Sequence, residues 1–238
     1  HPVHFHLFDV QVLNRVGWDG FIRLPDPTEL GWKDTVRISP LEDTIVALRP
    51  LVPHVPWDLP NSVRLIDPSM PEGVSLTDIG MLIFDPLGQP VQVTNHYVNF
   101  GWEYVWHCHI LSHEEMDMMR PQVLGVTPRA PSALAFEVIG TEPDQQVVLS
   151  WEDNSLNETA FTVERAATAD GPWMTLAVLP AGTTTYEDPV GVASQGYVYR
   201  VYASNTVGDT EVYPASIGFP NETMVSEFSN VVEVVPAP

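Results

Sequence analysis

Positive charge is scarce in this sequence. Lysine and arginine together number 10, against 31 aspartate and glutamate residues, and Lys33 is the sole lysine. The formal net charge is therefore −21 at pH 7. Nucleic acid is excluded as a partner, because its phosphates require a basic protein surface.

Two further scarcities narrow the class of protein. The chain has one cysteine, so it forms no internal disulfide, and cysteine pairing says nothing about its redox compartment. It has no apolar run of about 18 residues, the length that a membrane-spanning helix needs, and no long helical periodicity. Proline is plentiful, with 23 residues against 15 glycines, which favours many short strands joined by ordered loops. The sequence predicts an all-β protein without a membrane span.

The single cysteine lies in an unusual motif. Residues 106–118 read WHCHILSHEEMDM, so Cys108 is flanked by two histidines and followed by a third histidine and by methionines. A thiolate, two imidazoles and a thioether are the donor set of a blue-copper centre, and such soft ligands suit copper better than magnesium or calcium. The second imidazole must come from elsewhere, and residues 1–6, HPVHFH, offer three.

Strand geometry predicts how these histidines divide. We expect a β-strand over residues 1–13, where apolar residues loosely alternate, and a second strand over residues 103–109. Side chains in a strand point alternately to opposite faces. One site then takes His1, Cys108, His113 and Met118, which follow a Cys-x4-His-x4-Met spacing. The other face presents His4, His6, His107 and His109, four imidazoles without a thiolate.

The pair of segments HPVHFH and HCHILSHEEMDM resembles the two C-terminal copper motifs of the multicopper oxidases, which include laccases, bilirubin oxidases and ascorbate oxidases. The segments GWKDTV (31–36) and DMMRP (117–121) are similar to the branch of spore-coat laccases and bilirubin oxidases. The resemblance covers about the first half of the chain. It implies that His1, Cys108, His113 and Met118 bind type 1 copper, that His4 binds type 2 copper, and that His6, His107 and His109 bind type 3 copper.

The same resemblance implies an activity. A laccase-like oxidase takes single electrons from a phenol, an aromatic amine or a bilirubin-like pigment at type 1 copper and reduces O2 to water at a trinuclear cluster. His113 would be the entry point for electrons, and Cys108 would join it to the neighbouring histidines. Glu114 adjoins a ligand and is our candidate for a proton relay; the alternative is a solvated carboxylate that only caps the loop.

The inventory of histidines is incomplete for such a cluster. The family uses eight histidines, four of them from two HxH motifs in an N-terminal domain, and no further HxH occurs here. His54 and His96 stand alone; each could contribute to a substrate mouth, but a lone loop histidine is more often a surface residue, and we expect both to be surface residues. The chain therefore reads as an N-terminally truncated C-terminal fragment that needs the missing cupredoxin domains and is inactive by itself. In the alternative, His1 is a mature terminus whose amine helps to bind copper.

A short proline-rich connector at residues 127–132 follows the copper motifs. The predicted architecture is a cupredoxin-like Greek-key barrel over residues 1–126 and a β-sandwich over residues 133–238. Alternating apolar residues mark strands around Val147, Phe161 and Tyr197. The segment from Tyr197 to Gly208 resembles part of a fibronectin type III domain, with Tyr197 as its corner tyrosine.

Other functions stay open at this point. The chain could be a stand-alone blue-copper electron-transfer protein, although the histidine face would then lack a role. It could oxidise metal ions such as copper or manganese, but of Met116, Met118 and Met119 only Met118 has ligand spacing, and the other two are expected to pack in a core. It could also be an adhesive module. We expect an extracellular or periplasmic location, where both predicted domains are common.

Overall fold

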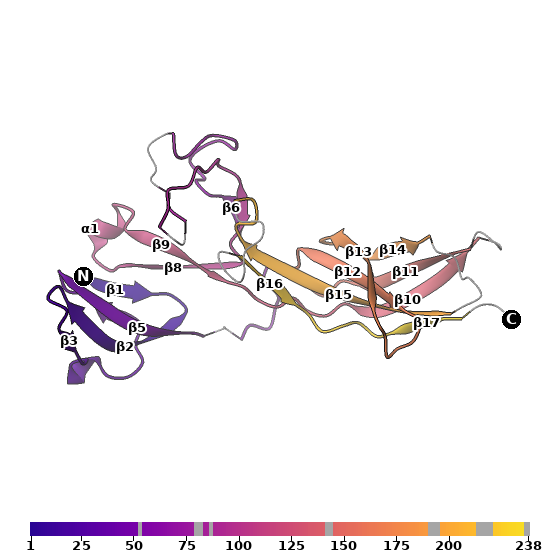
Figure 1. Ribbon diagram of the computed structural model, residues 1–238, viewed down its shortest axis with the longest axis horizontal. Coiled ribbons are helices and arrows are strands. Elements are labelled where there is room, and N and C mark those ends of the chain that lie inside the picture. The colour runs from indigo at the N-terminus through magenta and orange to yellow at the C-terminus, as the bar shows by residue number, and fades with distance from the viewer. Residues whose placement is uncertain are drawn as a thin grey trace. The chain divides into compact units, whose positions relative to one another are not determined.

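A computed structural model describes residues 1–51, 54–78, 83–85, 88–140, 145–189, 196–212 and 221–235. The chain forms two compact units (Figure 1). Unit 1 comprises residues 1–57 and 103–124, and unit 2 comprises residues 58–102 and 125–238.

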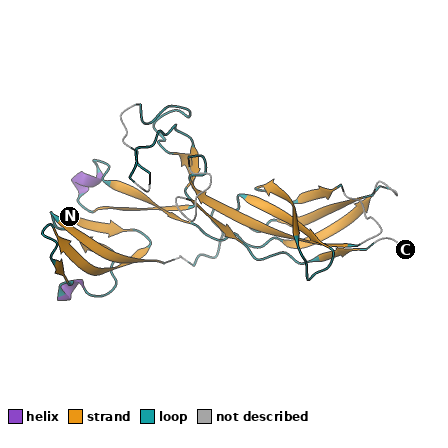
Figure 2. Ribbon diagram, viewed as in Figure 1, coloured by secondary structure: helices purple, strands orange, loops and turns teal. Residues whose placement is uncertain are grey.

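The all-β class is confirmed. Antiparallel strands dominate both units (Figure 2), and the two helices in the described part of the chain are a 3₁₀ turn, η1 (Pro27–Glu29), and one turn of α-helix, α1 (Leu111–Glu114). In the part of the chain that the structure describes, no helix is long and apolar enough to cross a membrane.

Unit 1 contains two antiparallel sheets. The first has the strand order β4 (Thr35–Arg37), β1 (Pro2–Phe5), β8 (Trp102–Cys108) and β9 (Met119–Leu124). The second has the order β3 (Ile22–Arg23), β2 (Phe8–Gly17) and β5 (Glu42–Pro50). The backbones of Val10 and Lys33 exchange two hydrogen bonds, of 2.7 and 2.8 Å, which join β2 to the segment that leads into β4.

The expected single strand over residues 1–13 is two strands. Leu7 has a φ of 68°, in the left-handed region that an L-residue seldom adopts, and the chain turns there from β1 into β2. The ladder with β8 nevertheless continues to His6, whose N–H donates to the carbonyl of Val105 at 3.0 Å. The alternation of faces therefore holds through all the histidines of the N-terminal motif.

The interior of unit 1 is small and partly ionic. Val10, Val12 and Val36 are buried, and Phe5, Phe8 and Val46 pack against them. On β2, Arg15 is 2% exposed and bonds Glu29 at 2.6 Å and Glu42 at 2.7 Å. Burial acts to raise the pKa of Glu29, but the hydrogen bonds from the Arg15 guanidinium and from the backbone N–H of Asp26 outweigh it, and the pKa is lowered. A buried charge needs such partners, so these residues fix how β2, η1 and β5 meet.

Unit 2 is a two-sheet sandwich. One sheet has the order β10 (Ser132–Ile139), β11 (Gln146–Glu152) and β14 (Thr185–Asp188). The other has the order β13 (Met174–Pro180), β12 (Ala160–Ala166), β15 (Tyr197–Gly208), β7 (Tyr97–Asn99) and β6 (Val63–Leu65). Two further strands, β16 (Asn221–Val225) and β17 (Val232–Val234), also pair with β15. The core includes Leu149 and Trp151 from one sheet and Phe161 and Val201 from the other.

A buried polar cluster lies within this sandwich. Asp188 accepts hydrogen bonds from Arg165 at 2.7 Å and from the hydroxyl of Tyr199 at 2.9 Å. Burial, followed by this carboxylate, strongly raises the pKa of Tyr199. Tyr199 is fully buried, whereas Tyr197 is partly exposed and its ring lies 4.4 Å from the guanidinium carbon of Arg165. The role of Tyr197 as a corner tyrosine stays a prediction.

Residues 58–102 belong to unit 2, although the sequence places them in the first predicted domain. β7 pairs with β15 at Asn99 and Gly208, and Asn61 donates to Asn205 Oδ1 at 3.1 Å and to the carbonyl of Asn157 at 2.8 Å. Asn205 is fully buried and also donates to the carbonyl of Val126 at 2.9 Å. This segment is thus bonded to the sandwich through backbone and amide groups, and the domain boundary at residue 126 stays a prediction.

Candidate metal centre

The pairing of β1 with β8 sets the arrangement of the histidine and cysteine side chains. Val3 lies opposite Cys108, His4 opposite His107, and Phe5 opposite Trp106. Residues directly opposite each other in an antiparallel pair point to the same face, and neighbours along a strand point to opposite faces. One face of this pair therefore carries the cysteine and the other carries imidazoles.

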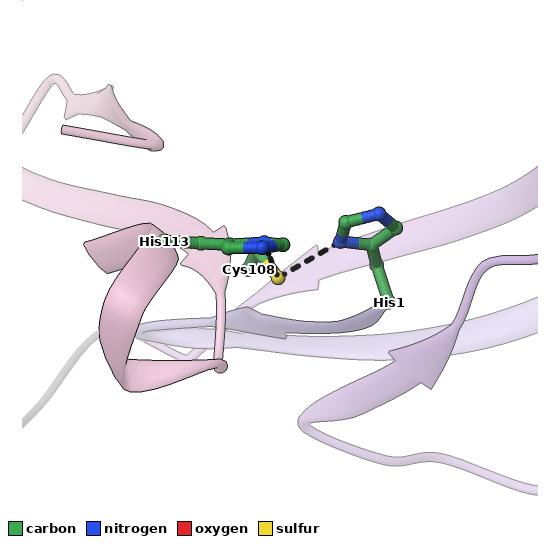
Figure 3. A group of neighbouring side chains, drawn as sticks. All are labelled: His1, Cys108 and His113. Carbon is green, nitrogen blue, oxygen red and sulfur yellow. Dashed lines mark hydrogen bonds between the residues drawn. The ribbon is translucent and has the colours of Figure 1, made fainter. Parts of the chain in front are cut away.

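On the first face, three predicted ligands meet. Nδ1 of His1 lies 3.1 Å and Nδ1 of His113 lies 3.5 Å from Sγ of Cys108 (Figure 3). All three donor atoms lie within 4.8 Å of one another, close enough for one metal ion. Cys108 is 4% exposed, so its sulfur is shielded while the two rings reach it from the surface. The amine of His1 donates to the carbonyl of Ile38 at 2.8 Å.

The loop after β8 returns His113 to the cysteine. α1 begins directly after Ile110, whose carbonyl accepts from the N–H of His113 at 2.8 Å. Met118 then donates its N–H to the carbonyl of His113 at 2.9 Å, and its own carbonyl lies 3.4 Å from the N–H of Cys108. The backbone of Met118 is thus bonded to both neighbouring ligand positions. Its role as an axial ligand stays a prediction.

One residue of this loop has an unusual backbone. Asp117 has a φ of 63°, the left-handed conformation in which the chain turns back just before Met118. Aspartate is one of the few non-glycine residues that tolerates this region, and its side chain is exposed here. The turn needs either glycine or a residue of this kind, which explains why a short polar side chain occupies the position.

On the second face, imidazoles gather. Nε2 of His6 and Nε2 of His107 lie 3.3 Å apart, and the donor atoms of His4, His6 and His107 lie within 4.8 Å of one another. The ring of His109 is centred 5.6 Å from that of His4 and 5.3 Å from that of His107. The structure thus brings all four predicted histidines of this face together. Their role as ligands stays a prediction.

Electrostatics favour the neutral form of at least one of these rings. Burial lowers the pKa of His6, and the nearby His4, His107 and His109 lower it further, since a second positive charge there is repelled. Glu114 acts in the opposite direction but more weakly. A neutral imidazole is the form that binds a metal, so crowding these rings prepares the face for a cation.

Glu114 lies beside this second face. Its Oε1 is 3.5 Å from Nδ1 of His107 and 3.6 Å from Nδ1 of His109, beyond an ordinary hydrogen bond but within ion-pair range. α1 carries both this carboxylate and His113, so one helical turn presents one residue to each face. The structure places Glu114 where it can orient the imidazoles or exchange a proton with them.

Aromatic residues lie on the cysteine face. The rings of Phe5 and Trp106 are stacked, with their centroids 6.0 Å apart and their planes 12° apart. They line an apolar cavity of about 570 Å³ whose other walls come from β2, β4, β5 and β9. Sequence reasoning missed these residues, although Trp106 is two positions before Cys108 in the same strand and so shares its face. Phe5 lies directly opposite Trp106 and therefore takes that face as well.

The expectations for His54, His96 and Met116 had different outcomes. His54 is exposed, as expected, whereas His96 is buried and hydrogen-bonded within unit 2, which makes the surface assignment wrong. Met116 is 80% exposed, so the expected core packing is also wrong for this residue. Neither histidine belongs to a group of potential metal ligands in the described part of the chain.

No protein-family model matches the chain. The chain is 27% identical over 164 residues to a laccase of Haloferax volcanii, an alignment covering 69% of this chain and 20% of that protein. It is 25% identical over 134 residues to a laccase of Bacillus subtilis, covering 51% of this chain and 17% of that protein. An Fn3-like protein from Clostridium thermocellum matches 48% of this chain and 98% of its own chain, with 22% identity and a TM-score of 0.32. Part of the chain is distantly related to laccases, and it spans about a fifth of their length.

Proposed function

We propose that the chain supplies one complete thiolate copper site and half of the histidine ligands of a trinuclear cluster in a laccase-like multicopper oxidase. The four further histidines would come from cupredoxin domains that lie outside residues 1–238. The chain alone would then lack turnover. The distant relationship to laccases supports the reaction class, and the reducing substrate would be a small phenol, aromatic amine or pigment.

One observation carries the proposal. A cysteine–histidine group and a histidine group occupy opposite faces of one strand pair, and Cys108 is adjacent in sequence to His107. The link between the two groups is therefore a single peptide unit. A protein that only transfers electrons at the cysteine would need the first group and would have no use for the second.

The donor set fits copper. The first group offers a buried sulfur and two imidazole nitrogens, a soft combination that favours copper and disfavours magnesium or calcium. The second group offers imidazoles alone, which suit copper as well. When bound, copper would supply one-electron oxidation of the reducing substrate and four-electron reduction of O2 to water.

The residues of the chain have distinct tasks in this scheme. His113 is partly exposed and reaches the sulfur of Cys108, so its edge can receive an electron from a substrate at the surface. Trp106 and Phe5 keep the cysteine side apolar. Glu114, beside His107 and His109, holds a proton or releases one at the histidine face. The proposed compartment is extracellular or periplasmic.

Copper titration with absorption spectroscopy tests the proposal. With Cu(II), the wild-type chain is expected to develop an intense thiolate-to-copper band in the visible region and to bind copper on the histidine face as well. Cys108→Ser should abolish the band while leaving copper on the histidine face. An unchanged spectrum in that variant, or no band in the wild type, would remove the assignment of Cys108.

A further inference from the structure

The ring of His4 is anchored through its Nδ1 atom. Its Nδ1 lies 3.0 Å from the backbone carbonyl oxygen of Asp34 and 3.2 Å from the hydroxyl oxygen of Thr35. A carbonyl oxygen has no hydrogen to give, so Nδ1 must carry the proton and donate. A neutral ring has one N–H, which leaves Nε2 of His4 as a bare lone pair.

The hydroxyl of Thr35 is itself oriented. Its oxygen lies 3.0 Å from Oδ1 of Asp34, and an ionised carboxylate can only accept. The single hydroxyl hydrogen therefore points to Asp34, and the oxygen lone pairs point to His4. The N–H of His4 thus has two acceptors, the carbonyl of Asp34 and the hydroxyl oxygen of Thr35, and the hydroxyl of Thr35 donates in turn to the carboxylate of Asp34.

The sheet builds this arrangement without a metal. His4 on β1 lies directly opposite Thr35 on β4, so the two side chains share a face. The carbonyl of Asp34 also accepts the N–H of Phe5 at 2.9 Å, which fixes it in the ladder and leaves its second lone pair for His4. The rings of His6, His107 and His109 are centred 4.8 to 5.6 Å from that of His4.

We propose that Thr35, together with the carbonyl of Asp34, is a positioning residue that holds His4 as the Nδ1–H tautomer and so presents Nε2 to the histidine face before any metal arrives. The value of this for metal binding rests on the proposed function. Metal-binding histidines commonly donate their second ring nitrogen to such partners, and loss of the partner lowers metal affinity about 10–100-fold.

The tautomer can be read in the metal-free chain. Nitrogen-15 NMR of the ring of His4 should show the Nδ1–H form in the wild type, and Thr35→Ser, which keeps a hydroxyl, should match it. Thr35→Val removes the hydroxyl at nearly equal volume and suits a strand, but it leaves the carbonyl of Asp34 as an acceptor. The Nδ1–H form should therefore remain the major form, and a measurable share of the Nε2–H form is expected because one of the two acceptors of Nδ1–H is lost. An Nε2–H ring in the wild type would overturn the proposal, as would a Val variant identical to the wild type.

Metal affinity gives the second readout. Cu(II) bound on the histidine face is measured by electron paramagnetic resonance, while the visible band reports Cys108 separately. Thr35→Val should lower the affinity of the histidine face for Cu(II) about tenfold and leave the visible band unchanged. Thr35→Ser should keep the wild-type affinity. Equal affinity in the Val variant would refute the positioning role. A wild type with the Nδ1–H ring but no visible band from Cys108 would instead contradict the proposed function.

Discussion

The two hydrogen-bond partners of His96 require its imidazole ring to be protonated. Its Nδ1 lies 2.7 Å from the carbonyl of Thr94, and its Nε2 lies 3.1 Å from Oδ1 of Asp209. Both partners only accept when Asp209 is ionised, so the ring must carry two protons to satisfy them. Burial favours the neutral ring, but the bond to Thr94 and the charge of Asp209 outweigh it and raise the pKa of His96.

The direction of the pH effect follows from that shift. Because the folded-state pKa lies above the unfolded value of about 6.5, protonation stabilises unit 2 fully below that pH. The contribution is lost as pH rises through the folded-state pKa. Asp209→Asn removes the charge but keeps an oxygen for the N–H groups of Glu211 and Val212. We expect this variant to lower the free energy of unfolding at pH 5 and to have a smaller effect at pH 9.

Urea unfolding at the two pH values measures this difference. His54→Gln is the control substitution, since His54 is exposed in a loop. An equal loss of stability at both pH values in Asp209→Asn would show that the pair does not depend on protonation.

The proposed proton relay at Glu114 leads to a second prediction. If it exchanges protons at the histidine face, Glu114→Gln should slow O2 consumption by the complete oxidase while leaving the visible copper band intact. Rates of general acid–base steps typically fall about 10²–10⁴-fold when the group is lost. Glu115→Gln is the control on the same loop, because its carboxylate is exposed. Unchanged turnover in Glu114→Gln would remove the relay role and leave a merely structural carboxylate.

At the scale of helices and strands, the sequence predicted the features that depend on local periodicity, which are the positions of strands and the faces that side chains take. Period-two alternation correctly located strands around Val147, Phe161 and Tyr197, and it correctly separated His4 from Cys108. The break at Leu7 was not foreseen, since a left-handed leucine has no sequence signal. The ligand roles themselves stay predictions.

Contacts between residues that are far apart along the chain could not be predicted from the sequence. The burial of His96 depends on Asp209, which is 113 positions away, and the anchoring of His4 depends on Thr35 across a strand pairing. Alternation within one strand says which face a residue takes, but it says nothing about the register of the neighbouring strand. Both contacts therefore become visible only in the folded chain.

The loop from Cys108 to Met118 offers a test at this scale. Asp117 is exposed and left-handed, so Asp117→Val places a β-branched residue where it is strained by about 1–3 kcal/mol. We expect a weaker visible copper band and a lower unfolding temperature, because the turn carries Met118 back toward Cys108. Asp117→Gly should keep the band, since glycine adopts this φ freely. A full-strength band in the Val variant would show that the turn does not govern the site.

At the scale of the whole molecule, the excess of negative charge affects the stability of the fold. The chain carries 21 more acidic than basic residues, and in the described part of the chain at least six arginines pair with carboxylates: Arg15, Arg23, Arg37, Arg49, Arg165 and Arg200. The remaining acids have few positive neighbours available in the sequence. Their mutual repulsion opposes the compact state and is felt over a distance that salt controls.

Added salt should therefore stabilise the protein. Going from about 10 mM to about 150 mM NaCl shortens the screening length from about 30 Å to about 8 Å, which weakens repulsion among the excess acids. Exposed ion pairs such as Arg37–Asp26 weaken too, but each contributes at most about 1 kcal/mol, and the buried pairs of Arg15 and Arg165 are little screened. We expect the unfolding temperature to rise by about 2–4 °C for each kcal/mol gained. Scanning calorimetry in NaCl and in choline chloride at equal ionic strength separates screening from specific sodium binding. A fall in unfolding temperature with either salt would mean that ion pairs, rather than excess negative charge, dominate the electrostatics of the fold.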